Sequence, residues 1–225
     1  MIPRIPEPEL MDDAEQVRAY AEADFAEPHD AFVAHFRARF PNFQGGRVLD
    51  LGCGPADVTV RFLRAHPGCE VTALDGAAAM LAWARRRLEE EGLTDRVRLL
   101  EVRLPAPVPG GFDAVISNSL LHHLADPMVL WQTMRAASRP GACGFVMDLM
   151  RPSSLAVAQE LVARHCRAAP QLLRRDFYNS LLAAYTPEEV AVQLKQAGLD
   201  DWRVEVVSDR HWLAWGHLAA AEPSR

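Results

Sequence analysis

Short apolar segments alternate with longer amphipathic ones between residues 46 and 149. The short segments run into Gly, Pro or Asp and are typical of buried strands, whereas the longer ones are rich in Ala, Leu and Arg and favour helices. Regular alternation of strand and helix predicts parallel strands joined by right-handed crossovers. The expected strands are 47–51, 71–74, 97–102, 112–117 and 143–149, and the expected helices are 56–65, 77–91 and 127–138, with a turn at 139–141.

Helical patterns precede this alternation. A short helix is expected near residues 12–24, and another is expected to start near Pro28, because proline suits the first position of a helix. Phenylalanines recur at helix spacing at positions 32, 36 and 40, which predicts one buried stripe. The first ten residues are rich in proline and are expected to be extended.

The alternation stops after Pro152. Two helices with no strand between them are predicted there, as an insertion in the α/β pattern. Thr186 and Glu189 have the spacing of a capping box and should open a further helix. The predicted elements are helices at 153–167, 171–184 and 186–198, followed by strands at 202–207 and 211–216 that form an antiparallel hairpin.

The bulk composition narrows the class of protein. The chain has 225 residues and a formal net charge of -6, which fits one domain and argues against a long nucleic-acid surface. The four cysteines form no C-x-x-C pair, so we expect free thiols, no metal site and a reducing, cytoplasmic location. The N-terminus lacks the apolar core of a signal peptide, and no stretch is apolar and long enough to suggest a membrane span.

The segment with the most specific chemistry is a glycine turn between a strand and a helix. Asp50 ends the strand region, and Gly52 and Gly54 follow it. Glycines at such a turn let a ligand approach the backbone, and the following helix offers unpaired N–H groups. Asp75, at the end of the next strand, is placed to accept hydrogen bonds from ribose hydroxyls. A glycine turn alone would also fit an ordinary strand-to-helix connection.

This turn resembles the first motif of class I S-adenosylmethionine (SAM)-dependent methyltransferases, D-x-G-x-G-x-G. The resemblance covers about residues 40 to 150, and it implies a Rossmann-like, doubly wound α/β fold with a seven-stranded, mostly parallel sheet whose last strand is antiparallel. It also implies SAM as cofactor and S-adenosylhomocysteine (SAH) as product. Leu74-Asp75-Gly76 resembles the second, acidic motif of the family, with Met80 as the apolar residue against adenine. Residues 112–118 with Leu121-His122-His123-Leu124 resemble the fourth strand and its loop, and Pro140-Gly141 resembles the start of the fifth strand.

The chain departs from the family pattern at two positions. Ala56 replaces the third glycine of the first motif, and Glu101 stands where the third motif usually carries an Asp that contacts the adenine amino group. Glu101 could equally be an ordinary exposed residue. The cofactor-binding residues that the resemblance implies are Asp50, Gly52, Cys53, Gly54, Asp75, Gly76, Met80, Glu101, Val102 and Asn118.

A dinucleotide such as NAD is the main alternative ligand for the turn. Its fingerprint needs Gly-x-Gly-x-x-Gly, but here Asp57 takes the last position after Gly52 and Gly54. A carboxylate there should repel a diphosphate. The same carboxylate, like Asp50, suits a ligand that carries an ammonium and a sulfonium centre.

Candidates for catalysis lie outside the motifs. His122 and His123 follow the fourth strand and could act as a base near neutral pH, or could instead cap and pack under the next helix. Tyr20 could fold over the SAM site from the N-terminal helices, and Tyr178 lies in the helical insertion. Tyr20 could instead be a core or lid aromatic without a chemical role, and the segment around Tyr178 could be an ordinary exposed amphipathic helix. Alignment of the acceptor with the methyl group is expected to supply much of the rate.

We therefore predict one SAM-dependent methyltransferase domain over residues 1–225 that acts on a small molecule. Its predicted parts are a helical lid at 1–44, a SAM-binding core at 45–150, a substrate cover at 151–185 and a C-terminal helix and hairpin at 186–225. A protein or RNA acceptor and a non-catalytic SAM-binding module are the alternatives. We expect a monomer or homodimer without nucleic-acid or membrane partners, and the acceptor atom (O, N, S or C) stays open.

Overall fold

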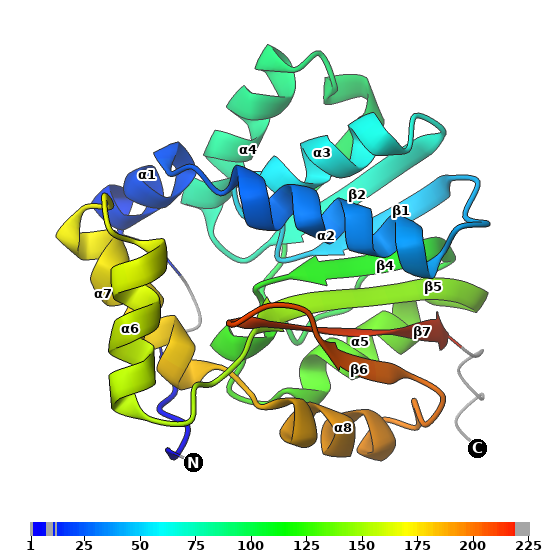
Figure 1. Cartoon of the computed structure of the whole chain (residues 1–225). Coiled ribbons are helices and arrows are strands. Elements are labelled where there is room, and N and C mark those ends of the chain that lie inside the picture. Colours follow the sequence, from blue (N-terminus) through cyan, green and yellow to red (C-terminus); the bar gives the residue numbers. More distant parts are fainter. Residues whose placement is uncertain (1, 8–10, 12, 219–225) are drawn as a thin grey trace.

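A seven-stranded sheet forms the centre of the computed structural model, which describes residues 2–7, 11 and 13–218 (Figure 1). The strand order is β3-β2-β1-β4-β5-β7-β6. Neighbours from β3 to β5 pair in parallel, whereas β7 is antiparallel to both β5 and β6. The predicted fold class is confirmed. The strands are β1 (Gly46–Leu51), β2 (Cys69–Asp75), β3 (Val97–Glu101), β4 (Phe112–Asn118), β5 (Ser138–Leu149), β6 (Arg203–Val206) and β7 (His211–Leu218).

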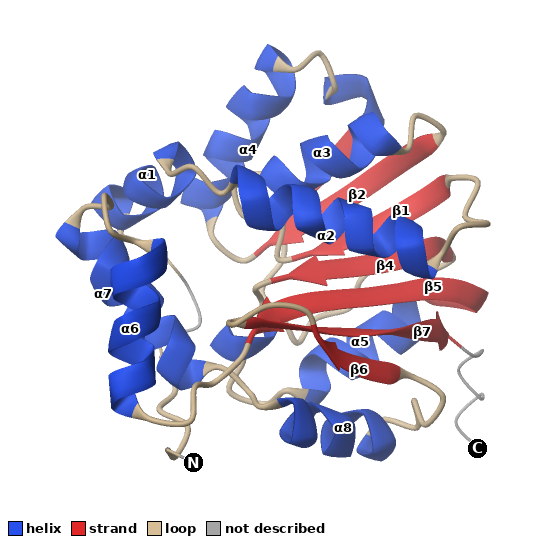
Figure 2. Ribbon diagram, viewed as in Figure 1, coloured by secondary structure: helices blue, strands red, loops and turns tan. Residues whose placement is uncertain are grey.

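Helices cover both faces of the sheet, so the molecule has three layers (Figure 2). α2, α3 and α4 lie over one face, and α5 and α8 lie over the other (Figure 1). α1, α6 and α7 gather beyond the carboxyl ends of the parallel strands. The helices are α1 (Ala14–Glu22), α2 (Ala26–Arg39), α3 (Asp57–Ala65), α4 (Ala78–Glu90), α5 (Met128–Ala137), α6 (Leu155–His165), α7 (Gln171–Ala183) and α8 (Pro187–Gln196), with 3₁₀ turns at η1 (Thr94–Arg96) and η2 (Leu121–His123).

Successive strand residues feed two separate cores because side chains alternate across a sheet. Val48 packs with the α2 and α3 layer, whereas Leu49 packs on the α5 and α8 side. The predicted phenylalanine stripe of α2 is buried in the first core, where the rings of Phe36 and Phe62 are 4.9 Å apart. Packing on both faces holds the carboxyl ends of β1, β2, β4 and β5 at one rigid edge.

Three predicted boundaries differ from the structure. α2 begins at Ala26, so Pro28 is its third residue. α3 begins at Asp57 because Ala56 takes a left-handed conformation with φ 63°. The turn expected at 139–141 is wrong: these residues belong to β5, which begins at Ser138 and passes through a register irregularity opposite β4.

The helices beyond the strand ends form a layer that also includes the N-terminal segment. The side chain of Gln16 in α1 donates to Asp176 in α7 at 2.9 Å. The backbone N–H of Ile5 donates to the carbonyl of Leu182 at 3.0 Å, which ties residues 2–7 to α7. This arrangement agrees with a lid and a cover as parts of one domain, a division that stays a prediction. Residues 1, 8–10 and 12 of the predicted lid and 219–225 of the predicted C-terminal part lie outside the described residues.

Candidate active site

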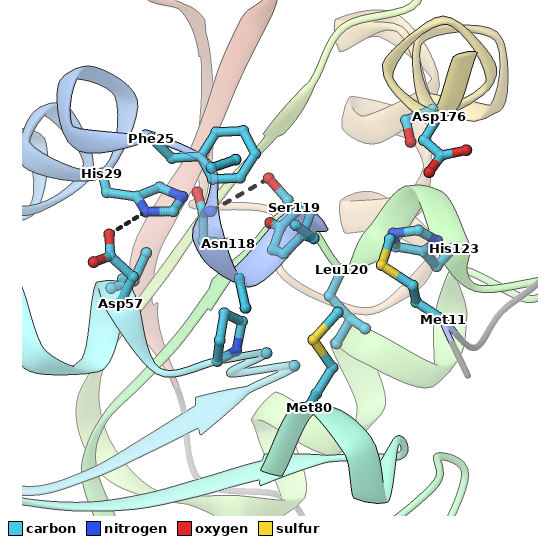
Figure 3. A pocket seen from close by; sticks show the side chains of 18 of the residues that line it. Met11, Phe25, His29, Asp57, Met80, Asn118, Ser119, Leu120, His123 and Asp176 are labelled. Carbon is cyan, nitrogen blue, oxygen red and sulfur yellow. Dashed lines mark hydrogen bonds and ion pairs between the residues drawn. The ribbon is translucent and has the colours of Figure 1, made fainter. Parts of the chain in front are cut away.

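A cavity of about 720 Å³ lies between the carboxyl ends of the strands and the helices α1, α6 and α7 (Figure 3). Its volume is in the range of small-molecule and cofactor sites, which is about 300–1,000 Å³. The order of the strands reverses between β1 and β4, and open α/β sheets bind ligands at such a reversal. The predicted site residues that line the cavity are Tyr20, Asp50, Gly52, Cys53, Gly54, Asp75, Gly76, Met80, Val102, Asn118, His122 and His123.

The glycine turn is held against the end of β2. The N–H groups of Gly52 and Cys53 both donate to the carbonyl of Leu74 at 2.9 Å. Asp75 accepts from the N–H of Gly54 at 2.9 Å through one oxygen and from the N–H of Ala77 at 2.8 Å through the other. Each carboxylate oxygen can accept more than one hydrogen bond. Asp75 therefore braces the turn and can still accept from a ligand.

Gly54 opens the turn to the cavity. Its φ is +52°, and a Cβ added there would meet no heavy atom within 4 Å. At Gly52, by contrast, φ is +74° and an added Cβ would lie 2.9 Å from the side chain of Leu120. The first glycine is thus required for packing of the turn, and the second leaves space for a ligand against the backbone.

Asp50 places a buried carboxyl on the cavity wall. Its side chain is 2% exposed and accepts a hydrogen bond of 2.6 Å from the Thr59 hydroxyl on α3. Burial raises the pKa of Asp50 from 3.8 to about 6, opposed by the hydrogen bond from Thr59 and assisted by the nearby charge of Asp75. A carboxylate held in this way favours a cationic ligand group beside it.

Asp57 also faces the cavity, but its charge is matched by protein cations. Its carboxylate lies 2.5 Å from His29 Nδ1, 2.8 Å from Arg61 Nε and 2.7 Å from Arg87 Nη1. Although burial acts in the opposite sense, hydrogen bonds from His29 and Arg61 hold the pKa of Asp57 well below its usual range. The sequence argument that Asp57 repels a diphosphate is therefore weakened, because Asp57 is not an isolated negative charge.

Glu101 is placed differently from the other predicted cofactor residues. It is exposed and lies opposite Asp75 in the β3–β2 register, outside the cavity lining. Adjacent residues of an extended chain point in opposite directions, and Val102 rather than Glu101 lines the cavity. Met80, which also lines the cavity, is buried against Val17 of α1.

His122 is buried and bonded to a carboxylate that the sequence analysis missed. Its Nδ1 lies 2.5 Å from Asp148 Oδ1 at the end of β5, and the two side chains are 3% and 1% exposed. Burial lowers the pKa of His122, but the charge and hydrogen bond of Asp148 outweigh it and raise that pKa above its ordinary value. The N–H of Leu121 donates to Asp148 at 2.7 Å, which fixes the carboxylate.

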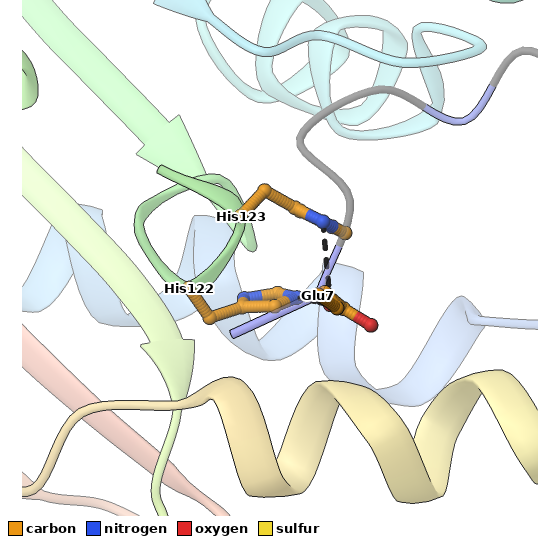
Figure 4. Close-up of side chains that lie close together, drawn as sticks. All are labelled: Glu7, His122 and His123. Carbon is orange, nitrogen blue, oxygen red and sulfur yellow. Dashed lines mark ion pairs between the residues drawn. The ribbon is translucent and has the colours of Figure 1, made fainter. Parts of the chain in front are cut away.

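His123 meets a second carboxylate, Glu7, which lies beside both imidazoles (Figure 4), whose ring centroids are 4.1 Å apart. Glu7 Oε1 lies 3.3 Å from His123 Nδ1 and 3.5 Å from His122 Nε2. The Ser180 hydroxyl on α7 donates to the same oxygen at 2.9 Å. Burial raises the pKa of Glu7, opposed by the charge of His122. The N-terminal segment, η2 and α7 therefore meet in one polar cluster of Glu7, His122, His123 and Ser180, which we call the Glu7 cluster.

The two predicted catalytic tyrosines differ in position. Tyr20 lines the cavity, its ring lies 4.9 Å from that of Phe25, and burial raises its pKa to about 12. A phenol with such a pKa stays protonated at neutral pH, so Tyr20 is suited to donate a hydrogen bond and not to act as a base. Tyr178 packs against the core of α6 and α7 and is not among the cavity-lining residues.

The sequence analysis missed two residues, Asp148 and Glu7, and only Asp148 has a signal in the sequence. Asp148 is a charged residue in the apolar run that forms β5, and a carboxyl at such a position usually has a partner. That pattern could have identified it. Glu7 lies in a proline-rich segment without periodicity, so no local signal connects it with His122 and His123.

Among the described helices, none is long and apolar enough to cross a membrane.

Comparison with known proteins agrees with this geometry. The methyltransferase domain family matches residues 49–143. The ubiquinone biosynthesis O-methyltransferase of Xanthomonas euvesicatoria pv. vesicatoria is 31% identical over 179 residues, which is 78% of this chain and 70% of that protein. An uncharacterized protein of Synechococcus sp. is 37% identical over 91 residues, which is 40% of this chain but only 22% of its own length.

A solved structure supports the fold independently. The plantazolicin methyltransferase BpumL, determined with a desmethylPZN analog and SAH, has a TM-score of 0.69 at 12% identity and covers 91% of this chain, which covers 90% of BpumL. The chain is therefore a Rossmann-like methyltransferase. It belongs to the SAM-dependent methyltransferase family, and SAM is its cofactor.

Proposed function

We propose that this chain transfers the methyl group of SAM to an oxygen atom of a small molecule that enters the cavity. The observation that carries the proposal is that one cavity is lined both by the glycine turn with its carboxylates and by the histidines of the Glu7 cluster. The relative at 31% identity is named an O-methyltransferase. An acceptor hydroxyl has a proton to lose, and the cluster provides groups that can take it.

The residues at the glycine turn fit SAM as a ligand. Gly54 leaves open space beside the backbone, and Asp50 and Asp75 provide carboxylates on that wall. In this proposal Asp50 faces the ammonium group of the methionine part, Asp75 accepts from the ribose hydroxyls and Met80 packs on the adenine. SAM supplies a methyl group activated by its positively charged sulfur. The chain's own residues hold the acceptor in line with the methyl group.

Proton removal from the acceptor is assigned to the second wall of the cavity. His122 and His123 both line the cavity and contact Glu7. Asp148 orients His122, so that Nδ1 faces the carboxylate and Nε2 faces Glu7. We assign Tyr20 as a hydrogen-bond donor to the ligand. Tyr178 has no assigned contact with substrate, and Glu101 has none with adenine.

The rival acceptors are a protein, an RNA or none at all. The helices α1, α6 and α7 lie beyond the carboxyl ends of the parallel strands (Figure 1), which favours a small acceptor over a protein, and a net charge of -6 gives no support for RNA. We further propose that the protein is cytoplasmic and works as a monomer or homodimer. The free thiols of its described cysteines support a reducing compartment.

The test is calorimetric titration of the protein with SAM, SAH and NAD, repeated with Asp75→Ala. We expect SAM and SAH to bind and the variant to lose at least tenfold in affinity. Transfer of isotope-labelled methyl groups is then measured with phenols, hydroxy acids, amines and thiols as acceptors. Failure of SAM to bind would contradict the proposal, and transfer to nitrogen or sulfur alone would refute the choice of oxygen.

A further inference from the structure

Three side chains that can ligate a metal ion converge beside the cavity: Glu7, His122 and His123 (Figure 4). Their ligand atoms all lie within 4.8 Å of one another. Glu7 Oε1 is 3.5 Å from His122 Nε2 and 3.3 Å from His123 Nδ1. Two ligands on one tetrahedral zinc ion, with bonds of about 2.0–2.1 Å, are about 3.3–3.4 Å apart. The distances from Glu7 thus already match those of a bound metal.

The partners of these ligands are those that metal sites use to orient their own ligands. His122 Nδ1 is 2.5 Å from the buried carboxylate of Asp148, which leaves Nε2 toward Glu7. The Ser180 hydroxyl donates to Glu7 Oε1 at 2.9 Å. A metal-ligating histidine almost always donates its other ring N–H to a carboxylate, carbonyl or water, and ligating carboxylates are themselves hydrogen-bonded.

The local charge also favours a cation. Two further carboxylates lie near these ligands: Asp148 Oδ1 is 2.5 Å from His122 Nδ1, and Asp176 is among the residues that line the cavity. The guanidinium of Arg4 is nearby, but it donates to the carbonyls of His122 and Leu124 at 2.8 and 3.2 Å and holds the backbone of η2. A cation among these three side chains would lie beside the carboxylate of Glu7 and near that of Asp148.

We propose that Glu7, His122 and His123 form a site for a divalent transition-metal ion of the Zn²⁺ type, with its fourth position open toward the cavity. Two imidazoles and one carboxylate are a ligand set of catalytic zinc sites, which keep one position for water or substrate. Both imidazoles line the cavity, so that position is accessible to a ligand there.

The role of the ion rests on the proposed function. An acceptor oxygen in the fourth position would have its pKa lowered by the cation, as zinc lowers that of bound water. The hydroxyl proton then leaves to solvent, and the oxygen keeps the electron pair that forms the new carbon–oxygen bond. The carbon–sulfur electrons of SAM return to sulfur, which becomes a neutral thioether. His122 would then be a ligand and not the base.

The experiment measures metal binding directly. Tag-free protein is stripped with EDTA and titrated with Zn²⁺ by calorimetry and with Co²⁺ by visible absorption. The variants are Glu7→Gln and His123→Gln. Controls are His217→Gln, which removes an exposed imidazole on β7, and Cys166→Ser, which removes a thiol from the same cavity. SAM binding to each metal-free variant reports whether the fold is intact.

We expect one equivalent of Zn²⁺ per chain and a Co²⁺ spectrum typical of low-coordinate nitrogen and oxygen ligands. Both site variants should bind at least tenfold more weakly, and both controls should match the wild type. Absence of binding to the wild type, or equal loss in a control, overturns the metal site. If Glu7→Gln does not fold, His123→Gln decides alone. Failure of SAM to bind metal-free protein would instead count against the proposed function.

Discussion

Replacement of Asp50 by Asn should stabilise the ligand-free protein while it weakens the binding of SAM. Asp50 is 2% exposed, and its pKa is raised from 3.8 to about 6, chiefly by burial. A raised pKa means that the ionised carboxylate is less stable in the folded protein than in the unfolded chain. Asparagine has nearly the same shape and no charge, and its carbonyl can still accept from the Thr59 hydroxyl.

The size of the stabilisation follows from the pKa values. The rise from 3.8 to about 6 corresponds to about 3 kcal/mol, at about 1.36 kcal/mol per pKa unit. A weaker hydrogen bond from Thr59 to an uncharged acceptor would offset about 1 kcal/mol of this. We therefore expect Asp50→Asn to raise the free energy of unfolding by about 2–3 kcal/mol at pH 8, a large fraction of the roughly 5–15 kcal/mol of a typical domain.

The stability difference between Asp50→Asn and wild type should depend on pH in a defined direction. For an acid with a raised pKa, the penalty is fully present above the folded pKa of about 6 and disappears as the pH falls below the unfolded value of 3.8. The difference between Asp50→Asn and wild type should therefore shrink by about 2 kcal/mol, to about 0–1 kcal/mol, near pH 4.5. Urea unfolding at the two pH values measures it, and Asp200→Asn, an exposed carboxyl, is the matched control.

Titration with SAM supplies the second half of the test. A charged hydrogen bond is worth about 1.5–3 kcal/mol, so the variant should bind SAM about 10- to 150-fold more weakly at pH 8. Wild-type affinity should fall below about pH 6 as Asp50 takes up a proton, and the affinity of the variant should not follow it. A variant that is less stable than wild type at pH 8, or that binds SAM equally well, would refute the reasoning.

Three further substitutions test the glycine turn and the cap of α8 independently. Gly54→Ala has space for its methyl group. It should cost about 1–2 kcal/mol of stability because of its left-handed backbone, and it should reduce SAM affinity. In Gly52→Ala the added Cβ would meet Leu120 at 2.9 Å, so this variant should lose more stability than Gly54→Ala in thermal unfolding. Thr186→Ala removes the capping box of α8 and should cost about 1 kcal/mol with no change in SAM titration; equal melting temperatures would contradict that cap.

Most of the fold could be predicted because the SAM-binding half has strong periodic patterns. Strands such as 112–118 are apolar runs that end at polar residues, and helix 78–90 is rich in strong helix formers. The mistaken turn at 139–141 came from Pro140 and Gly141, which usually interrupt a strand. Here they lie on β5 where its register with β4 shifts, and an irregularity of that kind tolerates both residues.

The site could be predicted only in part because the residues of one cavity wall are close together in sequence, whereas those of the other wall come from distant segments. The cofactor wall comes from residues close in sequence to one turn or one strand end, such as Asp50 and Gly54, so spacing reports their positions. The other wall depends on contacts between distant segments: Glu7 meets His122 across more than a hundred residues, and Asp148 meets it from β5. No local pattern records such a contact, and Tyr178 shows that a plausible residue of the insertion can pack away from the cavity.

The two walls of the cavity also differ in how rigidly the protein holds them. The glycine turn is held by β1 and β2, which are buried on both faces and leave little freedom at Asp75. The Glu7 cluster instead joins η2 to α7 and to the N-terminal segment, through Ser180 and through Arg4, which donates to the carbonyls of Ala183 and His122. A movement of α7 would therefore displace Glu7 relative to the histidines without disturbing the turn. We therefore expect variants of the Glu7 cluster to alter acceptor turnover far more than they alter the affinity for SAM.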